Sequence, residues 1–244
     1  MTTHAPNPID WLLLVLLALG LPLRAWLAMR RLRAASEDEA ARLRPRLWLR
    51  AITTQWLLSA AVILQWLVTR RPLDSLSLSP ALGWGAAGVL LGVAVMAVLF
   101  GAQRRGLASS PEVAARLSER LAPVKRLMPA SRAEWPGFVA LCLTAGVCEE
   151  LLFRGFLLWL FAQFLPAWWQ AALAQAALFG IAHAYQGARG VLQTFAVGVF
   201  LTGVMWISGA IWPAMLVHAL LDLNSGDFAV RIAGLQRSRE VRPA

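Results

Sequence analysis

Seven apolar segments dominate this sequence, and their length restricts the chain to a bundle of helices that cross a membrane. A helix needs about 20 mostly apolar residues to cross the hydrocarbon layer, and about 17–25 are tolerated. Hydrophobic residues make up 59% of the chain and charged residues only 15%, a balance typical of integral membrane proteins. We therefore expect an all-α fold, a polytopic transmembrane bundle with spans at about 9–29, 48–69, 82–101, 135–164, 168–184, 190–208 and 211–224.

The basic residues are distributed unevenly between the loops that join these segments. Outside the spans, only Arg70 and Arg71 lie on one side of the bundle, whereas the other Lys and Arg residues lie on the opposite side. Cytoplasmic loops carry the excess of Lys and Arg, so the sequence predicts an N-out, C-in orientation. The net charge of +10 is thus concentrated where anionic headgroups lie, and we expect membrane lipids rather than nucleic acid as partners.

A surface helix is expected in the long loop before the fourth span. Ser110, Pro111 and Glu112 are typical of a helix start, and apolar residues recur after them at positions 113, 117, 121 and 124. Charged residues lie between these positions, so we interpret the segment as an amphipathic helix on the cytoplasmic membrane surface. The alternative is a solvated loop helix that contacts nothing else.

The fourth segment, 135–164, is longer than a span needs and carries the charges of Glu149, Glu150 and Arg154. Its length predicts a tilt, a kink or a start at the interface. One charge at the centre of a membrane helix costs about 2.5–3.5 kcal/mol on insertion scales, so unpaired charges facing lipid are not expected. Glu150 and Arg154 are four residues apart with the acid first, which favours an ion pair. We interpret this pair as mainly structural and Glu149 as the chemically active group; the alternative is that both glutamates are structural.

Two of the three histidines lie in separate predicted spans. Phe179 precedes His183 by one helical turn, and Asp222 follows His218 by one turn. A single buried histidine is usually structural, but two of them in separate spans beside an unpaired Glu149 favour catalysis. A glutamate and a histidine can together activate water, and a second imidazole can donate a hydrogen bond to a developing oxyanion.

No cofactor is expected from these residues, although a divalent metal such as zinc, held by two histidines and a glutamate, stays open. The sequence lacks a His-Glu-x-x-His motif, so three helices would have to supply the ligands. A cysteine nucleophile is not favoured, because the acid beside Cys148 opposes a thiolate. Cys142 and Cys148 are six residues apart in one predicted helix, a spacing that does not suit a disulfide.

The charged and aromatic residues of the last four spans form an ordered set of motifs. In chain order they are Glu149-Glu150-x-x-x-Arg154, Phe179-x-x-x-His183 and His218-x-x-x-Asp222. This set, over about residues 135–225, resembles the CPBP family of intramembrane proteases. That family includes type II CAAX prenyl endopeptidases, Abi proteins and bacteriocin-processing proteins.

The resemblance implies a helical membrane bundle and a glutamate-dependent peptidase. In such a peptidase Glu149 and His183 would activate water, while His218 and its partner would stabilise the oxyanion; a catalytic metal is not implied. The chain departs from the family at Asp222, where asparagine is common. An ionised aspartate cannot donate to an oxyanion as asparagine can. Asp222 is therefore either protonated or an orienting partner of His218.

We therefore expect an intramembrane endopeptidase of a bacterial inner (cytoplasmic) membrane. Its substrate would be a protein or peptide, lipidated or embedded in the membrane, cut near the cytoplasmic half of the bilayer. The expected single domain has three parts: 1–134 with three spans and the interfacial helix, a catalytic core at 135–228, and a basic tail at 229–244. The alternatives are a catalytically silent binding or immunity protein on the same scaffold and a zinc-dependent peptidase.

Overall fold

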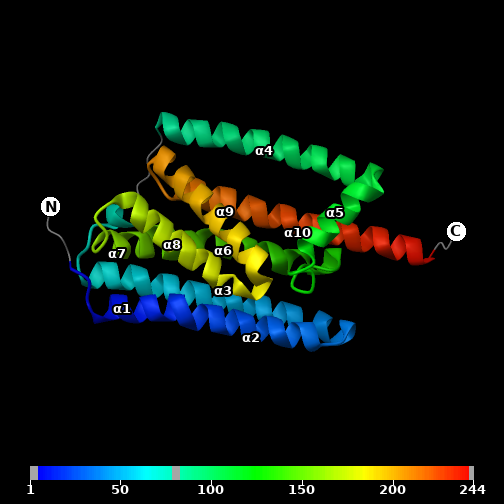
Figure 1. The fold of residues 1–244 in the computed structure, drawn as a ribbon, viewed down its shortest axis with the longest axis horizontal. Helices are drawn as coiled ribbons and strands as arrows, with labels where there is room; N and C mark the ends of the chain where they lie inside the picture. Colours follow the sequence, from blue (N-terminus) through cyan, green and yellow to red (C-terminus); the bar gives the residue numbers. More distant parts are fainter. Residues whose placement is uncertain (1–4, 79–82, 242–244) are drawn as a thin grey trace.

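A computed structural model describes residues 5–78 and 83–241, and this part of the chain is helical without strands (Figure 1). The all-α class is thereby confirmed. The α-helices are α1 (Pro8–Val15), α2 (Leu21–Ala34), α3 (Glu37–Val68), α4 (Trp84–Ser109), α5 (Pro111–Leu121), α6 (Trp135–Glu150), α7 (Leu158–Ala162), α8 (Trp168–Ala182), α9 (Gly187–Ser208) and α10 (Trp212–Val241). Two π-helical segments, Leu16–Gly20 and Leu151–Leu157, join α1 to α2 and α6 to α7. Short 3₁₀ turns cover Leu73–Leu76, Arg132–Glu134 and Ala184–Gln186.

Five helical segments within the described residues are long and apolar enough to cross a membrane, so the chain is an integral membrane protein. They are Pro8–Ala34, Glu37–Val68, Trp84–Gly106, Arg132–Ala162 and Ala184–Ser208. α8 has only 15 residues, and a helix that short does not reach across the hydrocarbon layer by itself. The count of seven spans and the N-out orientation stay predictions. The predicted start of the third span, residue 82, lies outside the described residues.

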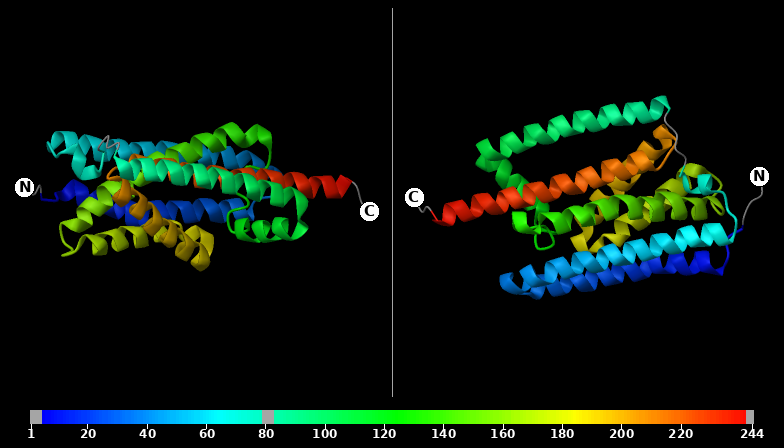
Figure 2. Two further views of the ribbon diagram at one scale, coloured as in Figure 1. Left: turned by 90° about the horizontal axis from the view of Figure 1, so that it is seen from above. Right: turned by 180° about the vertical axis from the view of Figure 1, so that it is seen from behind.

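The helices run roughly along one long axis, with α6 in the interior of the bundle (Figures 1 and 2). α6 packs against α3 on one side and α10 on the other. At the α10 contact a Cβ atom on Gly146 would lie 2.7 Å from the Met215 carbonyl oxygen and 2.9 Å from the Cβ of Ala219. Only glycine permits so close an approach of two backbones. This contact brings the end of α6, with its two glutamates, against the middle of α10.

The over-long fourth segment is interrupted directly after its glutamates. α6 ends at Glu150, and the seven residues Leu151–Leu157 form a π-helix in which every side chain is buried. π-helical turns are rare and occur frequently at functional sites, where they change the direction in which side chains point. Arg154 lies within this π-helix.

Several helices differ in length from the predicted spans. α3 begins at Glu37 rather than near residue 48, because the Ser36 side chain caps the helix by accepting from the Glu39 amide. The acids in the first turn also match the positive end of the helix dipole. α10 continues past Phe228 to Val241, through most of the predicted tail. The last tail residues, 242–244, lie outside the described residues.

The helix expected in the long loop is present as α5, and the Ser110 side chain caps it by accepting from the Val113 amide. Its apolar face contacts α10, where Leu117 and Leu121 pack against Phe228 and Ile232. The prediction of a helix at this place is therefore confirmed. Its location on the membrane surface stays a prediction.

A buried ion pair ties the first helix to the end of α3. Both carboxylate oxygens of Asp10 accept from the Arg71 guanidinium, at 2.8 and 2.7 Å. Oδ2 of Asp10 also accepts from the Asn7 amide at 2.8 Å. The guanidinium carbon of Arg71 lies 4.8 and 4.5 Å from the ring centres of Trp66 and Trp159. The charge of Arg71 is thus compensated by a carboxylate and by two aromatic faces.

Candidate active site

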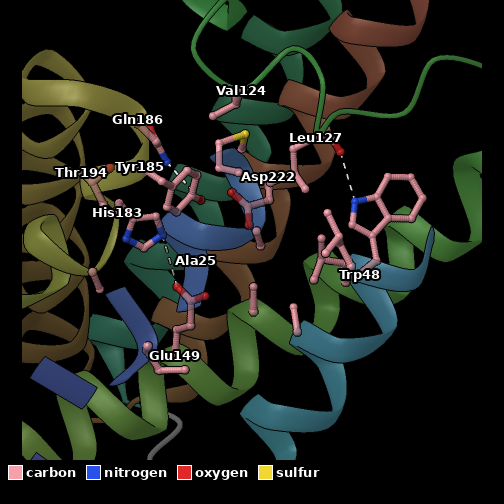
Figure 3. A pocket seen from close by; sticks show the side chains of 18 of the residues that line it. Ala25, Trp48, Val124, Leu127, Glu149, His183, Tyr185, Gln186, Thr194 and Asp222 are labelled. Carbon is pink, nitrogen blue, oxygen red and sulfur yellow. Dashed lines mark hydrogen bonds and ion pairs between the residues drawn. The ribbon is translucent and has the colours of Figure 1, made fainter. Parts of the chain in front are cut away.

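A cavity of about 1370 Å³ opens between the helices that surround the end of α6. The residues that line it come from α2, α3, α6, α8, α9 and α10 and from the segment after α5. The four predicted catalytic residues all line this cavity: Glu149, His183, His218 and Asp222. Figure 3 shows the side chains of His183 and Glu149 pointing toward each other within it. The structure therefore brings together residues that are up to 73 positions apart in the chain.

The two carboxylate oxygens of Glu149 have different surroundings. Oε1 accepts a hydrogen bond of 2.7 Å from Nε2 of Gln55, a residue of α3. Oε2 is buried and accepts no hydrogen bond from the described residues. A buried acceptor without a donor is destabilising by about 1–3 kcal/mol, and more when it is charged. Oε2 is therefore a site at which a donor would be bound strongly.

His183 presents a lone pair to this free oxygen. Its Nδ1 lies 2.8 Å from the Phe179 carbonyl oxygen. A carbonyl can only accept, so Nδ1 carries the proton, and in the neutral ring Nε2 is an acceptor. Nε2 lies 3.9 Å from Oε2 of Glu149, too far for a direct hydrogen bond. Two acceptors therefore face each other across a gap that suits a bridging donor.

The sequence predicted that His183 lies inside a helix, but the structure places it just after the end of one. α8 ends at Ala182, and His183 is its C-terminal cap, with φ −100° and ψ 18°. The 3₁₀ turn Ala184–Gln186 follows, and Gly187 then adopts φ 82°, a value that favours glycine. The chain thus turns at His183 itself, which directs the imidazole back toward α6.

His218 is held by the second glutamate. Its Nδ1 lies 2.8 Å from Oε1 of Glu150, and because a carboxylate accepts, Nδ1 donates. Its Nε2 lies 4.0 Å from Oε2 of Glu149 and 3.7 Å from Oδ2 of Asp222. His218 is buried, with 6% of its surface exposed. Nε2 thus faces the cavity, while the hydrogen bond from Nδ1 to Glu150 fixes the orientation of the ring.

Glu150 and Arg154 form the predicted ion pair, with Nη1 of Arg154 2.9 Å from Oε1 of Glu150. Arg154 also donates from Nη2 to the Gly198 carbonyl at 3.2 Å, and its guanidinium carbon lies 4.2 Å from the ring centre of Phe179. The prediction was incomplete for Glu150, because the same Oε1 also contacts His218. Glu150 therefore links the buried arginine to an imidazole of the site.

Asp222 occupies the cavity side of His218. Its side chain is 43% exposed, and it lies near Nε2 of His218 rather than near Nδ1. The orienting position at Nδ1 is occupied by Glu150. Asp222 therefore lies on the Nε2 side of the ring, and its role as a protonated donor or as an orienting partner of His218 stays a prediction. It contributes a carboxylate to the lining of the cavity (Figure 3).

Two residues that contact the site were missed from the sequence. Gln55 donates to Glu149, and the ring of Tyr185 lies 5.8 Å from the ring of His183. A signal existed for Gln55, since an amide in an apolar membrane helix requires a partner inside the protein. A weaker signal existed for Tyr185, which is the only tyrosine of the chain and follows His183 by two residues.

The described residues contain no group of three or more His, Cys, Asp or Glu side chains arranged to hold a metal ion. The expectation that no cofactor is needed stays a prediction, with a zinc-dependent peptidase as its alternative. Cys142 and Cys148 are both buried and free, so the expectation that they do not form a disulfide is confirmed.

Comparison with known proteins points to one family. Residues 131–224 match the family model described as type II CAAX prenyl endopeptidase Rce1-like. No curated protein and no solved structure matches the chain. The matched segment contains the glutamates, the arginine and both histidines of the site, and it ends two residues after Asp222. Through residues 131–224, this chain is similar to the Rce1-like type II CAAX prenyl endopeptidases, and this match supports the resemblance to the CPBP family of intramembrane proteases.

Proposed function

We propose that this chain is an intramembrane endopeptidase in which Glu149 and His183 activate water and His218 stabilises the oxyanion. One observation carries the proposal: Oε2 of Glu149 has no donor among the described residues and lies 3.9 and 4.0 Å from Nε2 of two imidazoles. Structural carboxylates in membrane helices are normally paired through both oxygens, because an unsatisfied group is costly there. A free oxygen opposite two histidines is better suited to chemistry.

The geometry around Glu149 supports activation of a water molecule. A water about 2.8 Å from each partner fits between two acceptors separated by 3.9 Å. It would donate one hydrogen to Oε2 of Glu149 and the other to Nε2 of His183. Its lone pairs would then point away from both bases and toward the carbonyl carbon of a substrate in the cavity. Proton transfer to Glu149 accompanies attack on that carbon, which is general base catalysis.

The oxyanion that forms is negatively charged and requires a donor. Because Nδ1 of His218 donates to Glu150, Nε2 can donate to the oxyanion only when the ring is an imidazolium. The carboxylates of Glu149, Glu150 and Asp222 surround this ring and compensate its charge. When the tetrahedral intermediate collapses, the proton on Glu149 passes to the leaving amine. The products are a carboxylic acid, which keeps the second proton of the water, and an amine; the acid then gives that proton up to form a carboxylate and an ammonium group, and both glutamates return to their starting state.

The cavity supports a peptide as substrate. Pockets for small molecules usually measure about 300–1,000 Å³, and this cavity is larger, at about 1370 Å³. Its wall includes apolar residues of α2, such as Leu23 and Leu27, beside the polar groups of the site. We therefore propose a peptide segment at the membrane, with or without an attached lipid, as the substrate. We propose the inner (cytoplasmic) membrane of a bacterium as the location.

The proposal is tested by comparing membranes that contain the wild-type protein with membranes that contain Glu149→Gln. Glutamine has nearly the same shape but cannot take a proton from water. Quantitative proteomics should find peptides, cut within or beside a membrane segment, that appear only with the wild-type protein. The same cut should be reproduced by purified protein in liposomes. Equal cleavage by Glu149→Gln would exclude Glu149 as the base.

A second arm of the experiment separates water activation by glutamate from metal catalysis. Purified active protein should contain well under one equivalent of transition metal and should keep its activity after dialysis against a strong chelator. Stoichiometric zinc that is lost together with activity, and that restores activity on return, would make Glu149, His183 and His218 metal ligands instead.

A further inference from the structure

Gln55 is a polar residue in the apolar helix α3, and it lies outside the segment that matches the family. We infer that Gln55 is a positioning residue for Glu149: its amide holds one carboxylate oxygen so that the other is presented to the two imidazoles. This inference rests on the proposed function. It makes a helix from the unmatched first half of the chain a required part of the site.

The single hydrogen bond between the two side chains is the first support. Nε2 of Gln55 lies 2.7 Å from Oε1 of Glu149. A carboxylate is planar, so a donor fixed on Oε1 also restricts the direction of Oε2. Oε2 is the atom that lies 3.9 Å from His183 and 4.0 Å from His218. Without the amide, the Glu149 side chain would lose its only donor among the described residues and could turn away from both rings.

The two fully buried glutamines of the described bundle behave differently from the partly buried Gln55. Gln175 of α8 donates to the Thr202 hydroxyl of α9 at 2.7 Å and to the Ala172 carbonyl at 3.0 Å, which joins two helices. Gln65 of α3 is buried, and its Nε2 has no partner among the described residues. Of these three glutamines, Gln55 is the one whose amide is directed at an ionisable side chain of the cavity.

The position of α3 does not depend on Gln55. The indole of Trp56 donates to the Thr144 hydroxyl of α6 at 3.2 Å, one helical turn before the glutamates. The indole of Trp48 donates to the Leu127 carbonyl at 3.1 Å, and its ring packs against Phe138. These contacts hold α3 against the part of α6 that leads up to the glutamates. A substitution at Gln55 should therefore leave the helix in place and change only the orientation of Glu149.

The consequence for catalysis is a lower turnover rate rather than weaker substrate binding. A misplacement of a reacting group by about 1 Å can lower a rate on the order of 100-fold. Gln55 contributes to the cavity wall, but its amide nitrogen is engaged by Glu149. We therefore expect kcat to fall while KM stays nearly unchanged.

The test uses the full chain in liposomes and the peptide cut found for the wild-type protein. Gln55→Met keeps the length of the side chain and removes the donor, and we expect kcat to fall about 10- to 100-fold. Gln65→Met is the matched control, since it is the same change in the same helix at a buried position that does not line the cavity. It should leave kcat within about twofold. Wild-type kcat in Gln55→Met, or an equal fall in both variants, would overturn the inference.

A second variant tests the donor itself. In Gln55→Glu, two carboxyl groups face each other, and a shared proton restores a donor to Glu149. Activity should therefore be very low at neutral pH and recover at least partly as the pH is lowered, a profile that the wild-type protein and Gln65→Met do not follow. A pH profile parallel to that of the wild-type protein would contradict the inference.

The result separates this inference from the proposed function. If Glu149→Gln is inactive and Gln55→Met is fully active, only the role of Gln55 is wrong. If Glu149→Gln is active, the proposed function itself fails. If Gln55→Met does not insert or fold while Gln65→Met does, Gln55 is a structural residue and the inference is wrong.

Discussion

Asp10 and Glu149 are both carboxylates inside the helical bundle, the first buried and the second partly buried, and the protein surrounds them in opposite ways. Both oxygens of Asp10 accept from Arg71, and a backbone amide adds a third hydrogen bond. Within the described part of the chain, Glu149 receives one hydrogen bond, from a neutral amide, and its second oxygen has no donor. Asp10 is completely inaccessible to solvent, whereas Glu149 lines a large cavity.

This difference separates a carboxylate that stabilises the fold from one that is available for reaction. A bidentate pair with arginine is strong and directional, and it leaves the acid no capacity to bind anything else. Glu150 combines the two arrangements, because one of its oxygens joins Arg154 and His218 while the other has no partner among the described residues. Substitutions at the three acids should therefore have separable effects on stability and on cleavage.

The largest effect is expected for Glu149→Gln, and it should fall on activity alone. Loss of a general base lowers the cleavage rate on the order of 10²- to 10⁴-fold. The free energy of unfolding, measured by denaturant titration in detergent micelles, should not decrease, because glutamine removes an incompletely paired charge from a buried position. A marked loss of stability would mean that Glu149 resembles Asp10 more than the geometry indicates.

Asp10→Asn should give the opposite result. It leaves the Arg71 guanidinium buried without its carboxylate, which lowers the free energy of unfolding by about 3–5 kcal/mol. Cleavage per folded molecule should stay within about twofold of the wild-type rate. Asp74→Asn is the control, because Asp74 is an exposed acid close to Arg71 in the chain. This variant should change neither the free energy of unfolding nor the cleavage rate. Loss of activity in the folded Asp10→Asn protein would remove the distinction between the two acids.

Glu150→Gln should lower both the free energy of unfolding and the cleavage rate. Its effects should therefore lie between those of Glu149→Gln and Asp10→Asn. Hydrogen bonds to charged groups contribute about 1.5–3 kcal/mol, and the change weakens those to Arg154 and His218. Cleavage should fall because His218 loses the partner that holds its ring. Arg154→Gln is the informative comparison: it should lower stability, yet it leaves the contact between Glu150 and His218 in place. Equal loss of cleavage in both variants would argue that Glu150 acts only through the arginine.

The smallest effect is expected for Asp222→Asn. Asparagine removes a partly exposed charge but adds a neutral donor beside Nε2 of His218, so cleavage should stay within about tenfold, or about 1.4 kcal/mol, of wild type. Asp222→Ala supplies neither charge nor donor and should lose considerably more. Near-complete activity in both variants, measured as kcat/KM in liposomes, would show that Asp222 takes no part in the site.

The sequence predicted the helical class, because apolar runs of this length leave few alternatives. It was less successful at the ends of helices. The start of α3 at Glu37 had a readable signal in Ser36 and the acids that follow, but the polar residues around it suggested a loop. The end of α8 at Ala182, directly before His183, had no clear local signal in the sequence. It depends on the turn that leads into α9.

For the site, the sequence identified the side chains but not all of their partners. The spacing of Glu150 and Arg154 is a property of one helix, so that pair could be predicted. The contacts of Glu150 with His218 and of Gln55 with Glu149 join different helices. They depend on how closely α6 approaches α10 and α3, and that distance is set by residues such as Gly146. Periodicity along one helix contains no information on such a distance.

The π-helix at Leu151–Leu157 also fixes the rotational phase of everything that follows it. In an α-helix each residue advances about 100° around the axis, and a π-turn accommodates an additional residue per turn. Deleting one residue from this segment would therefore convert a π-turn into an α-turn and leave the phase of α7 nearly unchanged. Trp159, which lies 4.5 Å from the guanidinium of Arg71, would keep its place against it. A single deletion next to the glutamates would thus redirect the side chains of the π-helix itself and spare the ion pair of Asp10.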